Sequence, residues 1–319
     1  MKKLAIKNFY QLILILKILV SNITKKIKKR LLSEDVVESY TKNGFAILKN
    51  IVSTQRINSL LENIFKLFCK YSEDYQDLKN LEQPWNTELF HKKFIEFRKK
   101  DPESFGAIYD SLKTSLTLTQ LVTDDKIVDY VAKFLKIEPS DLAISEPMCR
   151  LDVPNDKRNA LDWHQERSFF PQNRNGLNGL VCWIPLTDII EEMGPIHICP
   201  RSHAEGQLKL SKDRKKDVSY TTQIPVPEEL IKKYEDHVVS TNAGDAVFFN
   251  MLLFHRSGQN ISNKVRFAIQ GRFHTSTADD FIPFDLINYY NPFIKQKLEK
   301  KYNCSDIPNN KRQLPVAIN

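Results

Sequence analysis

Two residues with metal-binding side chains, His164 and Glu166, stand two positions apart in the segment Leu161-Asp-Trp-His-Gln-Glu-Arg-Ser-Phe-Phe170. If this segment is a strand, both side chains point to one face and can converge on one metal ion. A third ligand is available at His255, which ends an apolar run. Two histidines and one carboxylate form the facial triad of non-haem Fe(II) oxygenases, which leaves coordination positions open for other ligands. The spacing therefore predicts an iron centre at these three residues.

An arginine beyond the third ligand extends this prediction. Arg266 follows His255 by eleven residues and lies in a segment, residues 264–274, whose alternation of apolar and polar residues indicates a strand. A dicarboxylate that chelates iron at one end needs a cation at its other end, and a planar guanidinium can bind a carboxylate through two parallel hydrogen bonds. We therefore expect Arg266 to bind the distal carboxylate of such a co-substrate.

Five segments in a fixed order carry a resemblance to a known family: Tyr40–Leu48, Trp163–Glu166, Gly179–Asp188, Gly194–His203 and His255–Arg266. On these segments the chain resembles the phytanoyl-CoA dioxygenase family of Fe(II)- and 2-oxoglutarate-dependent oxygenases, over roughly Glu38 to His274. The resemblance implies that His164, Glu166 and His255 ligate Fe(II), and that dioxygen is the second co-substrate. It also implies that Arg266 and Ser257 bind 2-oxoglutarate, and that the fold is a double-stranded β-helix.

One residue departs from the family pattern, in which aspartate most often stands at the position of Glu166. The extra methylene moves the carboxylate by about one carbon–carbon bond, whereas metal–oxygen distances are held near about 2.0–2.2 Å. A local bend of the backbone could absorb this change. We interpret Glu166 as a metal ligand, and the alternative is a site that has lost its iron.

The formal net charge of +8 originates in the first 33 residues, which hold nine Lys or Arg and no acid. The remaining 38 Lys and Arg against 39 Asp and Glu sum to −1, so the rest of the chain is close to neutral. A nucleic-acid-binding domain normally carries a basic face. We therefore expect no nucleic-acid partner, and the family resemblance implies a small-molecule substrate. Five separated cysteines without a C-x-x-C pair are typical of the cytoplasm.

Residues 1–32 form a predicted basic amphipathic helix. Apolar side chains recur at spacings of four and three, and lysines fall on the opposite side. Only nine uncharged residues separate Lys7 from Lys17, fewer than the about 20 apolar residues of a membrane span. Two interpretations stay open: the helix lies on the inner face of an anionic membrane, or it docks on its own domain or in a homodimer.

We expect residues 33–279 to form the oxygenase domain, mostly helical over 33–142 and rich in strands over 143–279. Residues 280–319 then wrap the domain and end in a polar tail. Short strands separated by Gly and Pro favour a jelly roll over parallel βαβ units. The expected fold class is α+β, with a cupin-like double-stranded β-helix that helices support from outside.

The substrate pocket is the least determined part of the site. The segment from Arg167 to Gly179 is too long and too aromatic for a plain connector, so it is either a substrate lid or an insertion anchored by buried Phe side chains. Five residues near the motifs are pocket candidates, although an inward Trp such as Trp183 more often belongs to the core: Gln165, Trp183, Arg150, Arg167 and Phe169. The expected reaction is hydroxylation of an unactivated C–H bond in a small or lipid-linked substrate, with release of succinate and CO2. The alternatives are a non-catalytic cupin-like binding module and a membrane-recruited scaffold.

Overall fold

The computed structural model describes residues 34–156, 161–168, 170, 172–173, 176–208 and 225–281. The predicted amphipathic helix over residues 1–32 lies outside the described residues, as do Phe169 and the chain beyond Phe281. Among the described residues, no helix combines the length and the apolar character needed to cross a bilayer.

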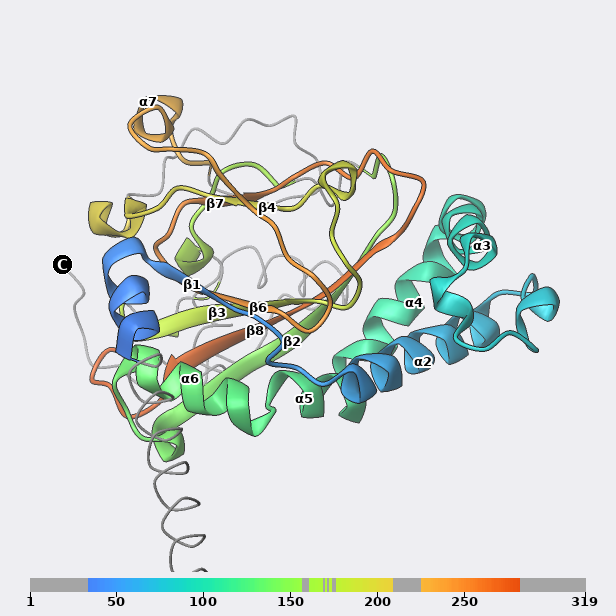
Figure 1. Ribbon diagram of the computed structural model, residues 1–319, viewed down its shortest axis with the longest axis horizontal. Helices are drawn as coiled ribbons and strands as arrows, with labels where there is room; N and C mark the ends of the chain where they lie inside the picture. Colours follow the sequence, from blue (N-terminus) through green and yellow to red (C-terminus); the bar gives the residue numbers. More distant parts are fainter. Residues whose placement is uncertain are drawn as a thin grey trace, which may run out of the picture.

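Two antiparallel sheets face each other and form the core of the domain (Figure 1). The larger sheet has the order β1-β6-β3-β8-β2, with β1 at Phe45–Leu48, β6 at Ala246–Asn250, β3 at Gly179–Pro185, β8 at Arg266–Thr275 and β2 at Leu142–Asp152. The smaller sheet has the order β5-β4-β7, with β5 at His237–Val239, β4 at Ile196–Ile198 and β7 at His255–Ser257. This is the predicted α+β fold with a cupin-like core.

Five helices lie along the outer side of the larger sheet (Figure 1). They are α2 (Thr54–Tyr71), α3 (Glu88–Lys100), α4 (Pro102–Lys113), α5 (Leu116–Val122) and α6 (Asp125–Leu135), and a short α7 (Glu228–Ile231) follows later in the chain. Residues 34–43 are also helical. The Asp101 carboxylate accepts a hydrogen bond from Ser104 N, and Pro102 occupies the first turn of α4. The chain therefore ends α3 and begins α4 at the Asp101-Pro102 pair, because aspartate is a favourable N-cap residue and proline is favourable in the first turn of a helix.

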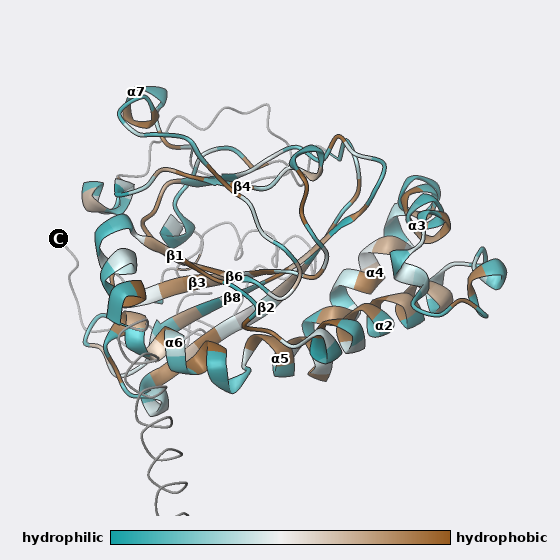
Figure 2. Cartoon of the chain, in the orientation of Figure 1, coloured by the Kyte–Doolittle hydropathy of each residue, from teal (hydrophilic) through white to brown (hydrophobic). Residues whose placement is uncertain are grey.

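The two faces of the larger sheet bury different cores. Phe267 and Phe248 point outward, where Phe267 packs against Phe90 of α3 and Phe248 packs against Phe134 of α6. Their strand neighbours Val247 and Ala268 point inward and pack beneath β4. Figure 2 shows the apolar residues concentrated on the strands and on the helix sides that meet them. The period of two along each strand thus separates a helix-packed face from an inner face.

The inner face is polar along β2 and β8. The register pairs Asp152 with Arg266 and Ser145 with Arg272, and residues that oppose each other across an antiparallel pair share a face. Burying a polar group costs free energy unless the group is hydrogen-bonded, so the buried polar side chains of this strip need hydrogen-bond partners. Its members are Ser145, Arg150, Asp152, Arg266, Gln270, Arg272 and His274.

Candidate metal centre

The three predicted ligands meet at one point. One ligand atom from each of His164, Glu166 and His255 lies within 4.8 Å of the other two, and all three residues are buried. Glu166 Oε2 lies 3.6 Å from His164 Nε2 and 3.4 Å from His255 Nε2. Ligands about 2.1 Å from a metal and at right angles to each other would be about 3 Å apart. The arrangement therefore fits a divalent metal after a small contraction.

The backbone that brings these residues together is not the strand that the spacing predicted. His164 and His255 form an isolated antiparallel bridge, with reciprocal N–H to carbonyl hydrogen bonds of 3.0 and 3.1 Å. Glu166 begins a 3-10 turn, Glu166–Ser168, instead of continuing a strand. The expectation that period two along a strand aligns His164 with Glu166 was therefore wrong. The bridge aligns the two histidines, and the turn carries the carboxylate back to them.

Both imidazoles are oriented for metal binding through their Nε2 atoms. His164 Nδ1 lies 2.7 Å from the carbonyl of Asp162, and His255 Nδ1 lies 3.0 Å from the carbonyl of Leu253. A carbonyl can only accept, so each Nδ1 carries the proton and each Nε2 keeps a lone pair. This arrangement fixes the tautomer that a metal ligand needs.

The two oxygens of Glu166 have different partners. Oε2 faces the histidines, whereas Oε1 accepts a 2.7 Å hydrogen bond from Arg272 Nε. Burial opposes ionisation of this carboxyl group, but the positive charge of Arg272 outweighs it and holds the pKa of Glu166 well below its ordinary value. Burial and the neighbouring His164 lower the pKa of His255. The carboxylate is therefore ionised and the His255 lone pair is available, as metal binding requires.

The predicted co-substrate residues lie on the same inner surface. Arg266 is buried and donates from Nε and Nη2 to Asp152 Oδ2, at 3.1 and 2.7 Å. Its Nη1 contacts the carbonyls of Met193 and Gly258 at 3.2 and 3.3 Å. Ser257, next to Gly258, shares a strand face with His255 because the two are separated by one residue of β7. The fold thus places Arg266 beside the end of β7 that carries Ser257.

The sequence prediction missed Arg272. This arginine contacts Glu166 directly, and its guanidinium carbon lies 4.2 Å from the ring centre of Phe170. The spacing from His255 directed attention to Arg266, but the alternation along β8 already placed Arg266 and Arg272 on one face. That alternation was the signal that could have identified Arg272.

Two of the predicted pocket residues have structural contacts. The Gln165 side-chain amide donates to the carbonyls of Gly206 and Leu252, and its oxygen accepts from Leu208 N. Because its donors and its acceptor are bonded to backbone groups, Gln165 joins three loops. Trp183 is buried in the apolar cluster between the sheets, opposite Gln270. It belongs to the core interpretation that the sequence left open.

The structure places two of the three remaining pocket candidates, Arg150 and Arg167, near the triad. Arg150 lies on the inner face and donates from Nε to Asp152 Oδ1 at 3.2 Å. Burial alone would lower the pKa of Arg150, but the negative charge of Asp152, with a smaller contribution from Glu166, raises this pKa above its ordinary value. Arg167 is buried beside the metal-site turn. Phe169 lies outside the described residues, and its neighbour Phe170 lies against the guanidinium of Arg272.

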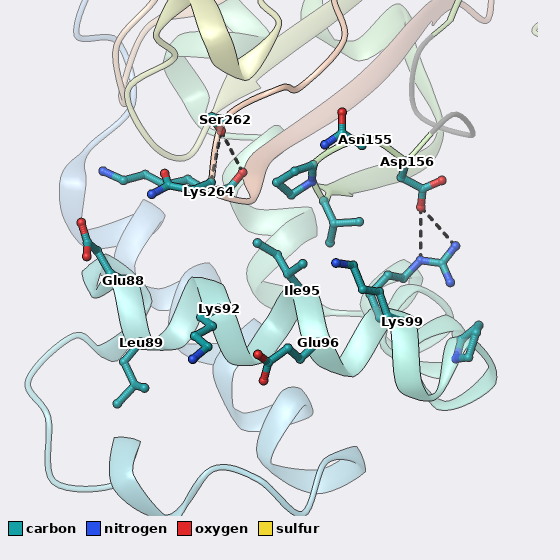
Figure 3. A pocket seen from close by; sticks show the side chains of 15 residues that line it. Glu88, Leu89, Lys92, Ile95, Glu96, Lys99, Asn155, Asp156, Ser262 and Lys264 are labelled. Carbon is teal, nitrogen blue, oxygen red and sulfur yellow. Dashed lines mark hydrogen bonds and ion pairs between the residues drawn. The ribbon is translucent and has the colours of Figure 1, made fainter.

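A wide groove of about 980 Å³ lies elsewhere, between α3 and the loops that follow β2 and precede β8 (Figure 3). Lys92, Glu96 and Lys264 are among its lining residues, and the Arg98–Asp156 ion pair lies at one side. Its lining includes no residue of the triad. Size alone therefore does not mark the site, and the convergence of ligands does.

Comparison with known proteins agrees with this geometry. Ectoine dioxygenase from Bordetella bronchiseptica (strain ATCC BAA-588 / NCTC 13252 / RB50) is 23% identical over 241 residues, which cover 72% of this chain and 71% of that protein. The crystal structure of the epimerase SnoN in complex with Fe3+, alpha ketoglutarate and nogalamycin RO superposes with a TM-score of 0.52 at 16% identity, covering 80% of this chain and 87% of SnoN. The apo structure of the non-heme monooxygenase ThoJ gives 0.50 at 15% identity, covering 84% and 99%.

These structural similarities show a shared fold, since their sequence identities are low. The family profile described as Phytanoyl-CoA dioxygenase (PhyH) matches residues 40–268, well over half of the 319 residues. The match contains the three converging ligands and Arg266. The chain therefore belongs to the phytanoyl-CoA dioxygenase family.

Proposed function

We propose that this protein is an Fe(II)- and 2-oxoglutarate-dependent dioxygenase that hydroxylates an unactivated C–H bond of a small-molecule substrate. The convergence of His164, Glu166 and His255 within 4.8 Å carries this proposal. Their donor set, two neutral imidazole nitrogens and one ionised carboxylate, is the one that non-haem Fe(II) oxygenases use. In the balanced reaction, substrate C–H, 2-oxoglutarate and O2 give C–OH, succinate and CO2.

Arg266 and Ser257 are the proposed partners of the distal carboxylate of 2-oxoglutarate. Arg266 Nη1 contacts Gly258 O, and Gly258 directly follows Ser257 at the end of the strand that begins with His255. The two carbonyl contacts of Nη1 are long, and a carboxylate would replace them with stronger, charge-assisted hydrogen bonds. Asp152 meanwhile holds the rest of the guanidinium in place.

The remaining residues orient the reactants and keep the site dry. Bound iron would supply activation of dioxygen, since redox chemistry of this kind belongs to the metal. The carbonyls of Asp162 and Leu253 fix the imidazole rings, and Arg272 fixes the second oxygen of Glu166. The Phe249 ring lies 4.6 Å from that of His255, and Val181 stands opposite Phe249 on the neighbouring strand. These contacts exclude water from the inner face.

Metal and co-substrate binding test the proposal first. Addition of Fe(II) and 2-oxoglutarate without oxygen should produce a weak visible charge-transfer band in the wild-type protein. Glu166→Ala should abolish this band and iron-dependent succinate release, because it removes the only carboxylate of the triad. Glu62→Ala, an exposed residue of α2 paired with Lys66, is the matched control and should behave as wild type.

The outcomes separate the proposed enzyme from its alternatives. A wild-type protein that forms no band would be a cupin-like binding module without iron. A Glu166→Ala variant that keeps both the band and succinate release would show that the ligand assignment is wrong. A band without any succinate release across acyl, amino-acid, phosphonate and nucleotide-sugar compounds would favour a passive module over a hydroxylase.

A further inference from the structure

The Arg272 guanidinium is only partly satisfied by the protein. Its Nε donates to Glu166 Oε1 at 2.7 Å, its Nη2 donates to Gln270 Oε1 at 2.6 Å, and the residue is 4% exposed. Its third nitrogen, Nη1, is buried and has no hydrogen-bond acceptor in the part of the chain that the structure describes. A buried, charged donor without an acceptor is costly, so native proteins usually pair it. A ligand with a hydrogen-bond acceptor could therefore pair with Arg272 Nη1.

The surroundings hold this guanidinium in one orientation. Glu166 and Gln270 occupy two of its nitrogens, and the Phe170 ring covers one face at 4.2 Å from the guanidinium carbon. A guanidinium held in this way presents Nη1 without further ordering, and such pre-organisation favours binding. Arg272 also lies next to the metal centre, because its partner Glu166 is one of the three predicted metal ligands.

His274 adds a second unpaired polar atom at this end of β8. It follows Arg272 by two residues on the same face, and its Nε2 lies 2.8 Å from Ser145 Oγ. Its Nδ1 is buried and has no hydrogen-bond partner among the described residues. Burial, followed by the charges of Arg272 and Arg167, lowers the pKa of His274 to about 4. The imidazole is therefore neutral at pH 7 and adds a polar contact without a charge.

The inner polar strip and Glu166 together carry an excess of one positive charge, to which the buried Arg167 near His274 adds. Arg150, Arg266 and Arg272 carry three positive charges, and Asp152 and Glu166 carry two negative charges, which gives +1 for these five described residues. Under the proposed function, Fe(II) adds +2 and 2-oxoglutarate adds −2, so the excess stays at +1. In a buried site of low dielectric constant, an unbalanced cation attracts an anion strongly.

We propose that Arg272 binds the substrate, and that the substrate carries a carboxylate or a phosphate group that accepts hydrogen bonds from Arg272 Nη1. This inference rests on the proposed function and adds the substrate class. Glu166 Oε2 faces the histidines while Oε1 is held by Arg272, so one carboxylate links the metal position to the anion position. Arg272 thereby sets which carbon of an anionic substrate lies near the metal.

Direct binding of small anions tests this site. Inorganic phosphate and acetate are titrated separately into the anaerobic protein with Fe(II) and 2-oxoglutarate, and binding is followed by the change in the charge-transfer band. We expect at least one anion to bind wild type, and the one that binds better identifies phosphate or carboxylate as the recognised group. Arg272→Gln should bind it ten- to a hundredfold more weakly, about 1.4 to 2.8 kcal/mol.

Matched variants make this result specific. Arg56→Gln removes an arginine that pairs with Asp124 on the helical side, and it should bind the anion as wild type does. Arg272→Lys keeps a cation beside Glu166 but lacks Nη1, so an approximately tenfold loss is expected even if Arg272→Gln fails to fold. Equal affinity in wild type and Arg272→Lys, or no binding of either anion to wild type, would overturn the proposal.

The co-substrate provides the last control. The affinity for 2-oxoglutarate should change less than threefold in Arg272→Lys. An equal loss for 2-oxoglutarate and for the anion would assign Arg272 to the co-substrate and overturn a role in substrate binding. If wild type forms no charge-transfer band, the proposed function fails, and phosphate and acetate binding to the metal-free protein, measured by calorimetry, still decides whether Arg272 is an anion site.

Discussion

The inward face of β8 carries an arginine near each end, and the two arginines have different surroundings. Arg266 donates twice to Asp152 and twice to backbone carbonyls. Arg272 donates to Glu166 and to Gln270, and its Nη1 has no acceptor within the described ranges. Both side chains are almost completely buried. The same residue type on one strand face is thus anchored at one end and partly unpaired at the other.

The neighbouring strand explains this difference. In the register of β2 and β8, the acid Asp152 stands opposite Arg266, whereas the small hydroxyl residue Ser145 stands opposite Arg272. A directly opposed carboxylate can accept two hydrogen bonds from a guanidinium, and a serine that already bonds His274 cannot. Cross-strand pairing therefore decides which arginine is mainly structural and which one has a nitrogen left for a ligand.

The largest stability effect is expected at the Arg266 end. Arg266→Met leaves the buried Asp152 without its two strongest hydrogen bonds, so the free energy of unfolding should fall by about 3–5 kcal/mol. Urea denaturation of the metal-free protein measures this loss. The double variant with Asp152→Asn should lose less than the sum of the two single variants, because each single variant already breaks the ion pair between Arg266 and Asp152. Strict additivity would show that the ion pair does not stabilise this end.

A smaller stability loss is expected at the Arg272 end. Arg272→Gln removes the hydrogen bonds to Glu166 and Gln270, but a proton taken up by one of the two histidines beside Glu166 can compensate its charge. We expect the free energy of unfolding of the metal-free protein to fall by about 2 kcal/mol, a value typical of hydrogen bonds to charged groups. Urea denaturation in parallel with Arg266→Met makes the comparison direct. A loss equal to or greater than that of Arg266→Met would contradict the difference between the two ends.

The smallest effect concerns pH, and it involves one buried histidine at each end. His91 accepts a hydrogen bond from the backbone N–H of Val265, next to Arg266, and burial lowers the pKa of His91 to about 4. The pKa of His274 is lowered to the same value by burial and, to a smaller extent, by the charges of Arg272 and Arg167. The ordinary value is 6.5, so the unfolded chain takes up these protons first as the pH falls. Stability present above pH 6.5 is then lost progressively down to pH 4.

Each histidine should lower the free energy of unfolding by about 1 kcal/mol between pH 7 and pH 5.5. Urea denaturation at several pH values measures this slope for wild type, His91→Gln and His274→Gln. Each variant should show a shallower decline than wild type. A slope that neither substitution changes would mean that both imidazoles protonate as readily in the folded state as in the unfolded chain.

The metal site shows how a correct prediction can rest on an incorrect local structure. The identity and spacing of His164, Glu166 and His255 predicted their convergence, and the three side chains do meet. The expected strand is absent there, because a bridge between the two histidines and a 3-10 turn at Glu166 perform the alignment. Ligand types follow from chemistry that the sequence displays, whereas the path of an irregular loop depends on distant hydrogen-bond partners.

Gln165 illustrates the opposite case. Its position between two predicted ligands made it a pocket candidate. In the structure its side-chain amide forms hydrogen bonds with the backbone of Gly206, Leu208 and Leu252, which lie far away in the sequence. The chain between them offers no pattern that predicts these contacts. Proximity in sequence to a site therefore says little about side-chain role where the backbone is irregular.

The sequence by itself determined the donor types of the metal site, the alternation that gives β8 an inner polar face, and the cap residues that end and begin helices such as α3 and α4. These properties are local, because they depend on chemical type and on short periodicities. Only the tertiary structure decided that Asp152 pairs with Arg266 while Arg272 reaches Glu166. Those contacts join residues more than 100 positions apart, so they depend on strand register and loop path, which no local pattern specifies.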